Sequence, residues 1–218
     1  MGMRILQAPD GSMCPSVTTI LDVINKPFLI QWANRLGKEG KDVDNEKEKA
    51  ARGGTAGHEM IQHTMGGEPI CEREFSAAEI AEGKVVLQKF LTCKGSVCWT
   101  MDTILMEERL FSKYGFCGAM DWYGKINGEL TLLDFKTGRG ISPEYVYQLA
   151  AYKKLLNEYG HKVRRVRILR LGRKMEWSLQ DFVIPKQQLA HGWKVFLSAF
   201  KLWKEKISYE EEYEKRWR

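Results

Sequence analysis

The chain has 218 residues, of which 44% are hydrophobic and 28% are charged, a composition that excludes a largely disordered protein. Lysine and arginine number 34 and aspartate and glutamate 28, which gives a formal net charge of +6. This excess favours a polyanionic partner such as nucleic acid, although many unrelated globular proteins are mildly basic. No apolar run approaches the ~18 residues of a membrane helix, so we expect no membrane association.

The N-terminal residues and the cysteines bear on the cellular compartment. Residues 1–15 contain no apolar segment of signal-peptide length, and the cysteine count is odd. We therefore expect an intracellular, reducing location, which would be the cytoplasm of a bacterial host if the chain comes from a phage. Cys93 and Cys98 are five residues apart. No second pair of ligands accompanies them, so we interpret both as plain thiols rather than zinc ligands.

Residues 16 to about 92 have the pattern of a helical region. Ser16 or Thr18 can cap a first helix, and Pro27 suits the first turn of a second helix. A glycine pair at 53–54 is expected to interrupt the pattern between a charged helix and the next one. The expected helices are 16–26, 27–37, 44–51, one through residues 58–63, and 76–91.

From residue 99 the pattern changes to strands, which indicates a sheet. Asn127-Gly128 separates two strand-like runs, and this dipeptide is a strong signal for a type I′ hairpin turn. Ser142 and Pro143 cap and open a later helix, which Gly160 ends. The expected strands are 103–114, 118–126, 129–136, 163–171 and 175–183, and the expected helices are 143–159 and 186–207.

This order of elements predicts an α/β protein with a central mixed β-sheet flanked by helices and a helical N-terminal region. We expect a single domain over residues 1–218. Its parts are a mainly helical region at 1–98, a sheet and helix with the chemistry at 99–185, and a C-terminal helix and tail at 186–218.

The segment that indicates chemistry contains Asp121, Asp134 and Lys136. Residues two apart on a strand share a face, so Asp134 and Lys136 point the same way, and the hairpin can place Asp121 beside them. Two carboxylates suit Mg²⁺ or Mn²⁺, which can polarise a phosphate and activate a water. A lysine can hold that water and offset the negative charge that develops on the phosphate.

A cross-strand salt bridge is the alternative interpretation of this group. It would explain one aspartate–lysine pair, and structural ion-pair networks are the usual confounder for such sites. It explains less well why Asp134 lies between apolar neighbours in a strand that otherwise faces the core. We therefore favour a functional site over a structural ion pair.

Four short motifs then occur in one order along the chain. They are Gly54-Thr55-Ala56-Gly57-His58, Gly118-x-x-Asp121, Asp134-x-Lys136-Thr137-Gly138, and Gln148-x-x-x-Tyr152. Together they resemble the PD-(D/E)XK nuclease superfamily, and the first and last resemble its RecB-type exonuclease branch. The segment 15–18 and Trp32 are similar to the N-terminal helices of small stand-alone phage and mitochondrial-genome-maintenance-exonuclease members.

The resemblance implies a restriction-endonuclease-like core and a role for each matching residue. His58, Asp121, Asp134 and the backbone carbonyl of Phe135 would bind the metal, and Lys136 would orient the water. Gln148 and Tyr152, which share a helix face, would support the site and contact DNA. Without the family pattern, His58 would be read as a packing histidine and Tyr152 as a half-buried packing residue.

The implied activity is a Mg²⁺- or Mn²⁺-dependent DNA exonuclease that prefers single strands and acts in replication, recombination or repair. Replication or recombination proteins are possible partners. A structure-specific or double-strand nuclease and a catalytically silent DNA-binding or assembly protein are the alternatives. Some relatives use late cysteines to bind an iron–sulfur cluster, but no cysteine follows Cys117, so we expect no such cluster.

Further residues are candidates for holding the substrate. Arg139 lies in the loop just beyond Lys136 and could contact a phosphate, and Trp122 could stack on a base. Core packing is an equal alternative for Trp122, because alternation along the strand turns one residue of the Trp122–Tyr123 pair inward. The basic run from Lys162 to Lys174 could bind phosphates or simply face solvent.

Overall fold

The structure is a computed structural model that describes residues 5–66, 74–96 and 99–217. Cys98, which we interpret as a plain thiol, therefore lies outside the described residues. The elements in chain order are β1 Ile5–Gln7, β2 Met13–Pro15, α1 Val17–Leu21, α2 Pro27–Lys38, α3 Val43–Gly66, α4 Ala77–Ser96, β3 Met101–Met106, β4 Arg109–Phe111, β5 Cys117–Ala119, β6 Trp122–Ile126, β7 Glu129–Lys136, α5 Pro143–Glu158, β8 Arg165–Arg170, β9 Gln180–Val183 and α6 Lys186–Trp217.

A five-stranded mixed sheet forms the centre, with strand order β3-β6-β7-β8-β9. The β6–β7 hairpin is antiparallel, and its turn places Asn127 and Gly128 at φ values of 50° and 81°, as a type I′ turn requires. After β7 the chain crosses through α5 and returns as β8, which pairs with β7 in parallel. The prediction of a mixed sheet flanked by helices is confirmed.

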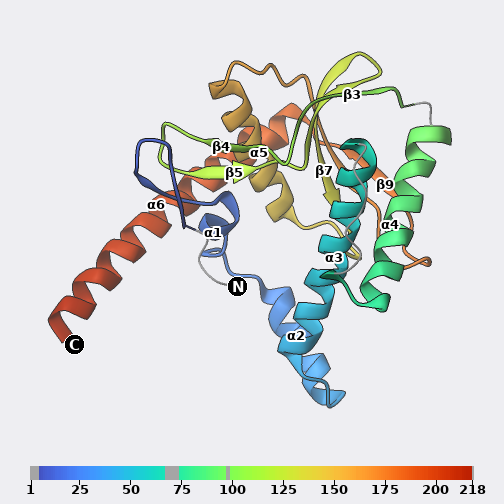
Figure 1. Ribbon diagram of the computed structural model, residues 1–218. Helices are drawn as coiled ribbons and strands as arrows, with labels where there is room; N and C mark the ends of the chain where they lie inside the picture. The colour runs from blue at the N-terminus through green and yellow to red at the C-terminus, as the bar shows by residue number, and fades with distance from the viewer. Residues whose placement is uncertain (1–4, 67–73, 97–98, 218) are drawn as a thin grey trace.

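Helices cover both faces of the sheet, and each face has its own core. Leu132, Val166 and Ile168 pack with residues of α1, α5 and α6 on one face. Leu133 and Phe135, which point to the opposite side of β7, pack with residues of α3 and α4. Figure 1 shows α3 and α4 side by side on their face, while α6 runs past α5 and ends away from the sheet. Alternation along β7 thus divides its side chains between the two layers.

The predicted interruption of α3 at residues 53–54 is wrong, because α3 is one continuous helix from Val43 to Gly66. The glycines are where α3 meets its neighbours. A Cβ atom on Gly57 would lie 2.9 Å from Val86 of α4, and one on Gly54 would lie 2.9 Å from Thr137 Oγ1. Close packing thus offsets the ~0.5–1 kcal/mol that each interior glycine costs a helix.

Four further features differ from the sequence-based expectation. The predicted strand 103–114 is split at Glu107, whose φ of 52° ends β3, and the predicted strand 118–126 is split before Trp122. Residues 5–15 form an unexpected hairpin of β1 and β2. The last helix, α6, continues to residue 217 through the segment that we expected to be a charged tail. None of the described helices is both long enough and apolar enough to cross a bilayer.

Candidate active site

Three acidic residues lie at the same end of three neighbouring strands. Glu107 follows β3, Asp121 precedes the antiparallel strand β6, and Asp134 is near the end of β7. The register pairs Met106 with Trp122 and Trp122 with Leu133, so the three acids are adjacent across the sheet. The Glu107 N–H also donates to the carbonyl of Met120 at 3.0 Å. The fold therefore gathers negative charge at one end of these three strands.

Asp121 is fixed by the backbone of the neighbouring strand. Its Oδ2 atom accepts a hydrogen bond of 2.6 Å from the Phe135 N–H. The Phe135 ring is buried and meets the rings of Phe90 and His58 edge-on, at centroid distances of 5.6 and 6.1 Å. The hairpin thus joins Asp121 to β7, as its position in the sequence predicts.

Asp134 is almost completely buried, with 1% of its surface exposed. Burial and the nearby Asp121 charge raise its pKa, and Lys136 opposes part of that rise. Both of its carboxylate oxygens are buried without a well-aligned hydrogen-bond partner among the described residues, although Oδ2 lies 2.7 Å from the Lys136 ammonium. A carboxylate oxygen left in this way is costly unless a ligand completes its surroundings.

Lys136 lies between the carboxylates and helix α5. Burial alone would lower the pKa of its ammonium, but attraction by Asp134 and Asp121 outweighs this effect and raises the pKa. Lys136 is therefore a cation at neutral pH and donates hydrogen bonds rather than accepting a proton. Its Nζ also lies 4.6 Å from the centroid of the Tyr145 ring, which contributes a cation–π contact.

Gln148 and Tyr152 extend this group along one face of α5. The Lys136 Nζ donates to Gln148 Oε1 at 3.3 Å, and Gln148 Nε2 donates to the Tyr152 hydroxyl at 3.0 Å. Tyr152 is buried, and a Cβ atom on Gly118 would lie 2.6 Å from its ring. Tyr152 therefore supports Gln148 from inside the protein, and Gln148 is the member of the pair nearer the lysine.

His58 approaches the carboxylates from α3. Its Nδ1 lies 3.7 Å from Asp121 Oδ2. One ligand atom each from His58, Glu107 and Asp121 lies within 4.8 Å of the others, a separation that one metal ion could bridge. Glu107 as a residue is exposed, but its carboxyl points into this group. Desolvation, and then repulsion by Asp121 and Asp134, raises the pKa of Glu107 to about 7.

The donor set of this group fits a hard divalent cation. Carboxylate oxygens with one imidazole are ligands that Mn²⁺ and Mg²⁺ sites use. Asp134 Oδ1 is buried without a hydrogen-bond partner among the described residues, and the Glu107 pKa is raised first by desolvation and then by repulsion from the two aspartates. A bound cation would complete the surroundings of the Asp134 oxygen and lower the pKa of Glu107 again.

Glu107 was not among the residues expected from the sequence. It falls in the segment Leu105-Met106-Glu107-Glu108, where two acids interrupt an otherwise apolar strand pattern. Acidic residues in an apolar run are the sequence signal by which Glu107 could have been found. The same signal identifies Asp134 on β7, two strands away in the sheet. The structure adds what the sequence lacked, which is the positive φ that turns the chain at Glu107.

The other two predicted site residues differ in their surroundings. Trp122 is fully buried in the core between the sheet and α3–α4, where its Nε1 donates to Thr103 Oγ1 at 2.9 Å. A stacking role for Trp122 is therefore contradicted, because its ring cannot meet a base, and the packing alternative holds. Arg139 is exposed in the loop after β7, and its carbonyl accepts a hydrogen bond from Arg170.

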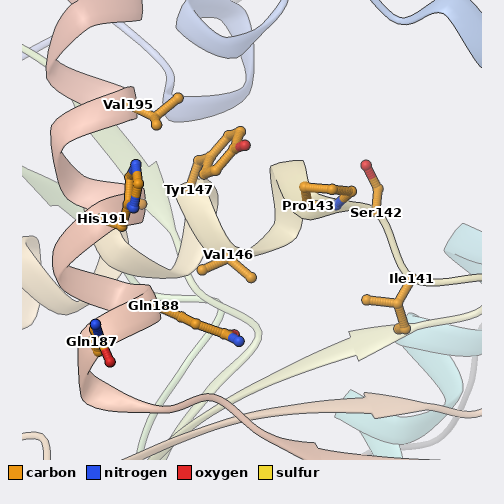
Figure 2. A pocket seen from close by; sticks show the side chains of 10 residues that line it. Ile141, Ser142, Pro143, Val146, Tyr147, Gln187, Gln188, His191 and Val195 are labelled. Carbon is orange, nitrogen blue, oxygen red and sulfur yellow. The ribbon is translucent and has the colours of Figure 1, made fainter.

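A cavity of about 610 Å³ lies next to this loop, between the start of α5 and the first half of α6. Figure 2 shows Val146 and Tyr147 of α5 facing Gln188 and His191 of α6 across it. Its lining contains no carboxylate side chain. The cavity therefore does not coincide with the acidic group, which is held against the end of the sheet.

No protein-family model matches the chain, and no curated protein matches it in sequence. Among solved structures it is similar to a proposed exonuclease from Eubacterium rectale, with a TM-score of 0.50 and 12% identity over 68% of this chain and 63% of that one. The chain thus spans less than two thirds of that protein. An alkaline exonuclease, LHK-Exo, from Laribacter hongkongensis matches with a TM-score of 0.45 and 11% identity over 94% and 95% of the two chains. At these identities, what the first likeness shows is a shared fold.

Proposed function

We propose that the chain is a metal-dependent DNA exonuclease of the PD-(D/E)XK type, on the RecB-type branch, which prefers single-stranded DNA. The observation that supports this most is the buried Asp134–Lys136 pair beside Asp121, His58 and Glu107. A structural ion pair needs no such neighbours, whereas a cation site next to a fixed ammonium suits metal-dependent phosphodiester hydrolysis. The fold shared with a proposed exonuclease agrees with this assignment.

In this proposal the Mg²⁺ or Mn²⁺ ion would be held by five groups: the side chains of Asp121, Asp134, Glu107 and His58 and the backbone carbonyl of Phe135. The cation would polarise the scissile phosphate and favour ionisation of the attacking water. Lys136 orients that water and offsets charge on the phosphate, which its cationic state allows. Gln148 positions the Lys136 ammonium, and Tyr152 holds Gln148. Replication, recombination and repair are the processes in which we expect the enzyme to act, without an iron–sulfur cluster.

The test is degradation of end-labelled DNA in Mn²⁺ and in Mg²⁺, with EDTA as the blank. Lys136→Met should abolish hydrolysis, whereas Lys125→Met, an exposed lysine of β6 near the far hairpin turn, should leave it unchanged. Equal rates for the two variants would remove Lys136 from the mechanism. Single-stranded, duplex, flap and closed circular substrates then separate the strand preferences, since only an endonuclease can cut a closed circle.

A catalytically silent DNA-binding protein would behave differently in the same assay. It would form a complex with DNA and show no turnover in Mn²⁺ with any substrate. The gathered acids argue against this alternative, because carboxylates near a DNA path repel phosphates unless a cation lies between them.

A further inference from the structure

A second charged pocket lies beyond the loop that follows Lys136. It is a cavity of about 550 Å³ at the ends of β8 and β9. Its lining residues are Arg139, Arg170, Lys174, Glu176, Trp177 and Ser178. Three cations against one carboxylate give this pocket a positive balance, which is the opposite of the acidic group beside it.

Arg170 is the unusual member of this lining. Only 6% of its surface is exposed, and within the described residues its guanidinium hydrogen-bonds only to neutral groups. Its Nε donates to Gln180 Oε1 at 2.9 Å, its Nη2 to Ser178 Oγ at 3.0 Å, and its Nη1 to the Arg139 carbonyl. A guanidinium has five N–H donors, so two of them remain available.

Three other arginines of the basic run from Lys162 to Lys174 are paired with acids. Arg165 pairs with Glu129, Arg167 with Asp181, and Arg173 with Glu82. For Arg170, the described residues provide no carboxylate within ion-pair distance. A buried charge without a counter-charge is unfavourable, and proteins normally compensate it with a partner or a ligand. The chain thus keeps a buried cation in the lining of this cavity, where a bound anion would supply the missing counter-charge.

The loop that carries the pocket is held in place by Lys89 of α4. The Lys89 ammonium donates to the carbonyls of Gly172, Lys174 and Trp177 at 2.7, 2.6 and 2.6 Å. The Arg173 N–H also donates to the carbonyl of Thr137 at 3.0 Å, which ties the loop to the end of β7. The pocket is therefore organised before any ligand binds, which lowers the entropic cost of binding.

The pocket is one strand away from the acidic group. Arg170 on β8 is the register partner of Lys136 on β7, and the Leu171 N–H donates to the Lys136 carbonyl at 2.8 Å. Neighbouring strands are ~4.8 Å apart, so two cations lie next to each other on one sheet face. An extended polyanion that reaches Lys136 would have further phosphates close to Arg170.

We propose that this pocket binds a second, non-scissile phosphate of the DNA strand, with Arg170 as its buried counter-charge. Lys174 and Arg139 supply outer charges, and the Ser178 hydroxyl can donate a further hydrogen bond. The proposal rests on the proposed function, because the strand must reach the acidic group. The phosphate is either internal to the strand or at its end, and both share the same chemistry.

The test measures binding without turnover. A fluorescent ten-nucleotide single strand is titrated with protein in Ca²⁺, in the presence of increasing KCl, and its anisotropy is followed. Lys174→Ala should weaken binding about tenfold or more, as expected for a charge-assisted hydrogen bond. It should also reduce the salt dependence by about 0.7 in log–log slope. The matched control is Lys125→Ala, which removes one exposed lysine from the other end of the sheet.

Arg170→Gln tests the buried charge itself, with circular dichroism to verify folding. A folded Arg170→Gln protein should lose affinity at least as much as Lys174→Ala. If Lys174→Ala binds with the affinity and salt slope of Lys125→Ala, the pocket does not take a phosphate. The Lys174→Ala result holds whether or not Arg170→Gln is stable, because Lys174 is exposed and its truncation leaves the core intact.

Oligonucleotides with 5′-phosphate, 3′-phosphate or hydroxyl ends identify the source of the phosphate. A terminal phosphate predicts that its removal weakens wild-type binding and leaves Lys174→Ala unaffected. An internal phosphate predicts equal losses for all ends. Hydrolysis is assayed separately in Mn²⁺, so the two ideas fail independently. If the wild type cleaves DNA and the pocket variants bind DNA as Lys125→Ala does, only the proposed phosphate pocket is overturned. If binding depends on the pocket but the wild type does not cleave DNA, the proposed nuclease function is overturned.

Discussion

The Asp121 carboxylate accepts a hydrogen bond from the backbone N–H of Phe135, one strand away, at 2.6 Å. The donor is a backbone N–H, so it stays in place when a side chain is substituted. The Asp121→Asn variant should therefore keep its fold but lose a ligand charge. We expect hydrolysis to fall by at least ~10²-fold, because a metal supplies several kcal/mol of transition-state stabilisation. Rates on end-labelled DNA, with circular dichroism for the fold, measure this. A rate within a few-fold of wild type would exclude Asp121 from the site.

Tyr152 offers a test of the group that positions Lys136. Tyr152→Phe keeps the ring that packs against Gly118 but removes the hydroxyl that accepts from Gln148. Supporting groups around a metal site change activity by ~10–100-fold, so we expect a loss in kcat of that order with little change in KM. Steady-state kinetics separates the two parameters. A rise in KM with kcat unchanged would instead indicate that Tyr152 acts in substrate binding.

Glu107 links the site to the stability of the metal-free protein. The pKa of its carboxyl rises on folding from 4.5 to about 7, so between these values the folded state binds more protons than the unfolded state. Stability therefore falls as pH rises through that window. Glu107→Gln removes this contribution, so the variant should be the more stable protein at pH 8 and should lose less stability between pH 5 and pH 8.

Urea unfolding in EDTA at the two pH values measures this difference. The raised pKa of Asp181 contributes equally in both proteins and cancels in the comparison. Asp134 repels Glu107, so removing the Glu107 charge also relieves Asp134 and acts in the same direction. Parallel pH dependences for wild type and Glu107→Gln would show that folding does not raise the pKa of the Glu107 carboxyl.

The close contact of α3 with α4 predicts opposite effects of one substitution at two helical glycines. A Cβ atom at Gly57 would lie 2.9 Å from the Val86 side chain, whereas Gly37 in α2 has no atom within 4 Å of such a Cβ. Gly57→Ala should destabilise the protein by ~1–3 kcal/mol through overpacking. Gly37→Ala should stabilise it by ~0.5–1 kcal/mol through helix propensity. Denaturant unfolding of both variants checks this, and a stabilising Gly57→Ala would mean that the helices separate easily.

The sequence was sufficient for those parts of the fold that depend on local rules. The period of two along a strand places Asp134 and Lys136 on one face, and the structure confirms this with their 2.7 Å separation. The Asn127-Gly128 turn also follows from the conformations that these two residues tolerate. Alternation and turn chemistry act between near neighbours, which is why the hairpin could be predicted without the rest of the molecule.

The features that could not be predicted depend on contacts between distant segments. Glycines at 53 and 54 argue locally for a break in α3, but their lack of side chains lets Glu82 of α4 and Thr137 approach the helix. Trp122 alternates correctly with Tyr123, yet both are buried, because helices cover the two faces of β6. Glu107 joins Asp121 only through the order of strands in the sheet, which the sequence does not state.

Metal binding at His58 can be measured without any nuclease assay. A ligand that binds only the folded state stabilises it by RT ln(1 + [L]/Kd), which is ~2.7 kcal/mol at a hundred times Kd. For a chain of this size, such a gain raises the thermal midpoint by roughly 5–10 °C. EDTA-treated protein should therefore melt at a higher temperature when Mn²⁺ is added.

His58→Ala should need a higher Mn²⁺ concentration for the same rise in melting temperature, because it removes one donor of the His58–Glu107–Asp121 group. His191→Ala, at an exposed histidine of α6 beside the larger cavity, should melt as wild type does over the whole Mn²⁺ range. If the two histidine variants respond equally to Mn²⁺, His58 packs against Phe135 and does not bind the ion.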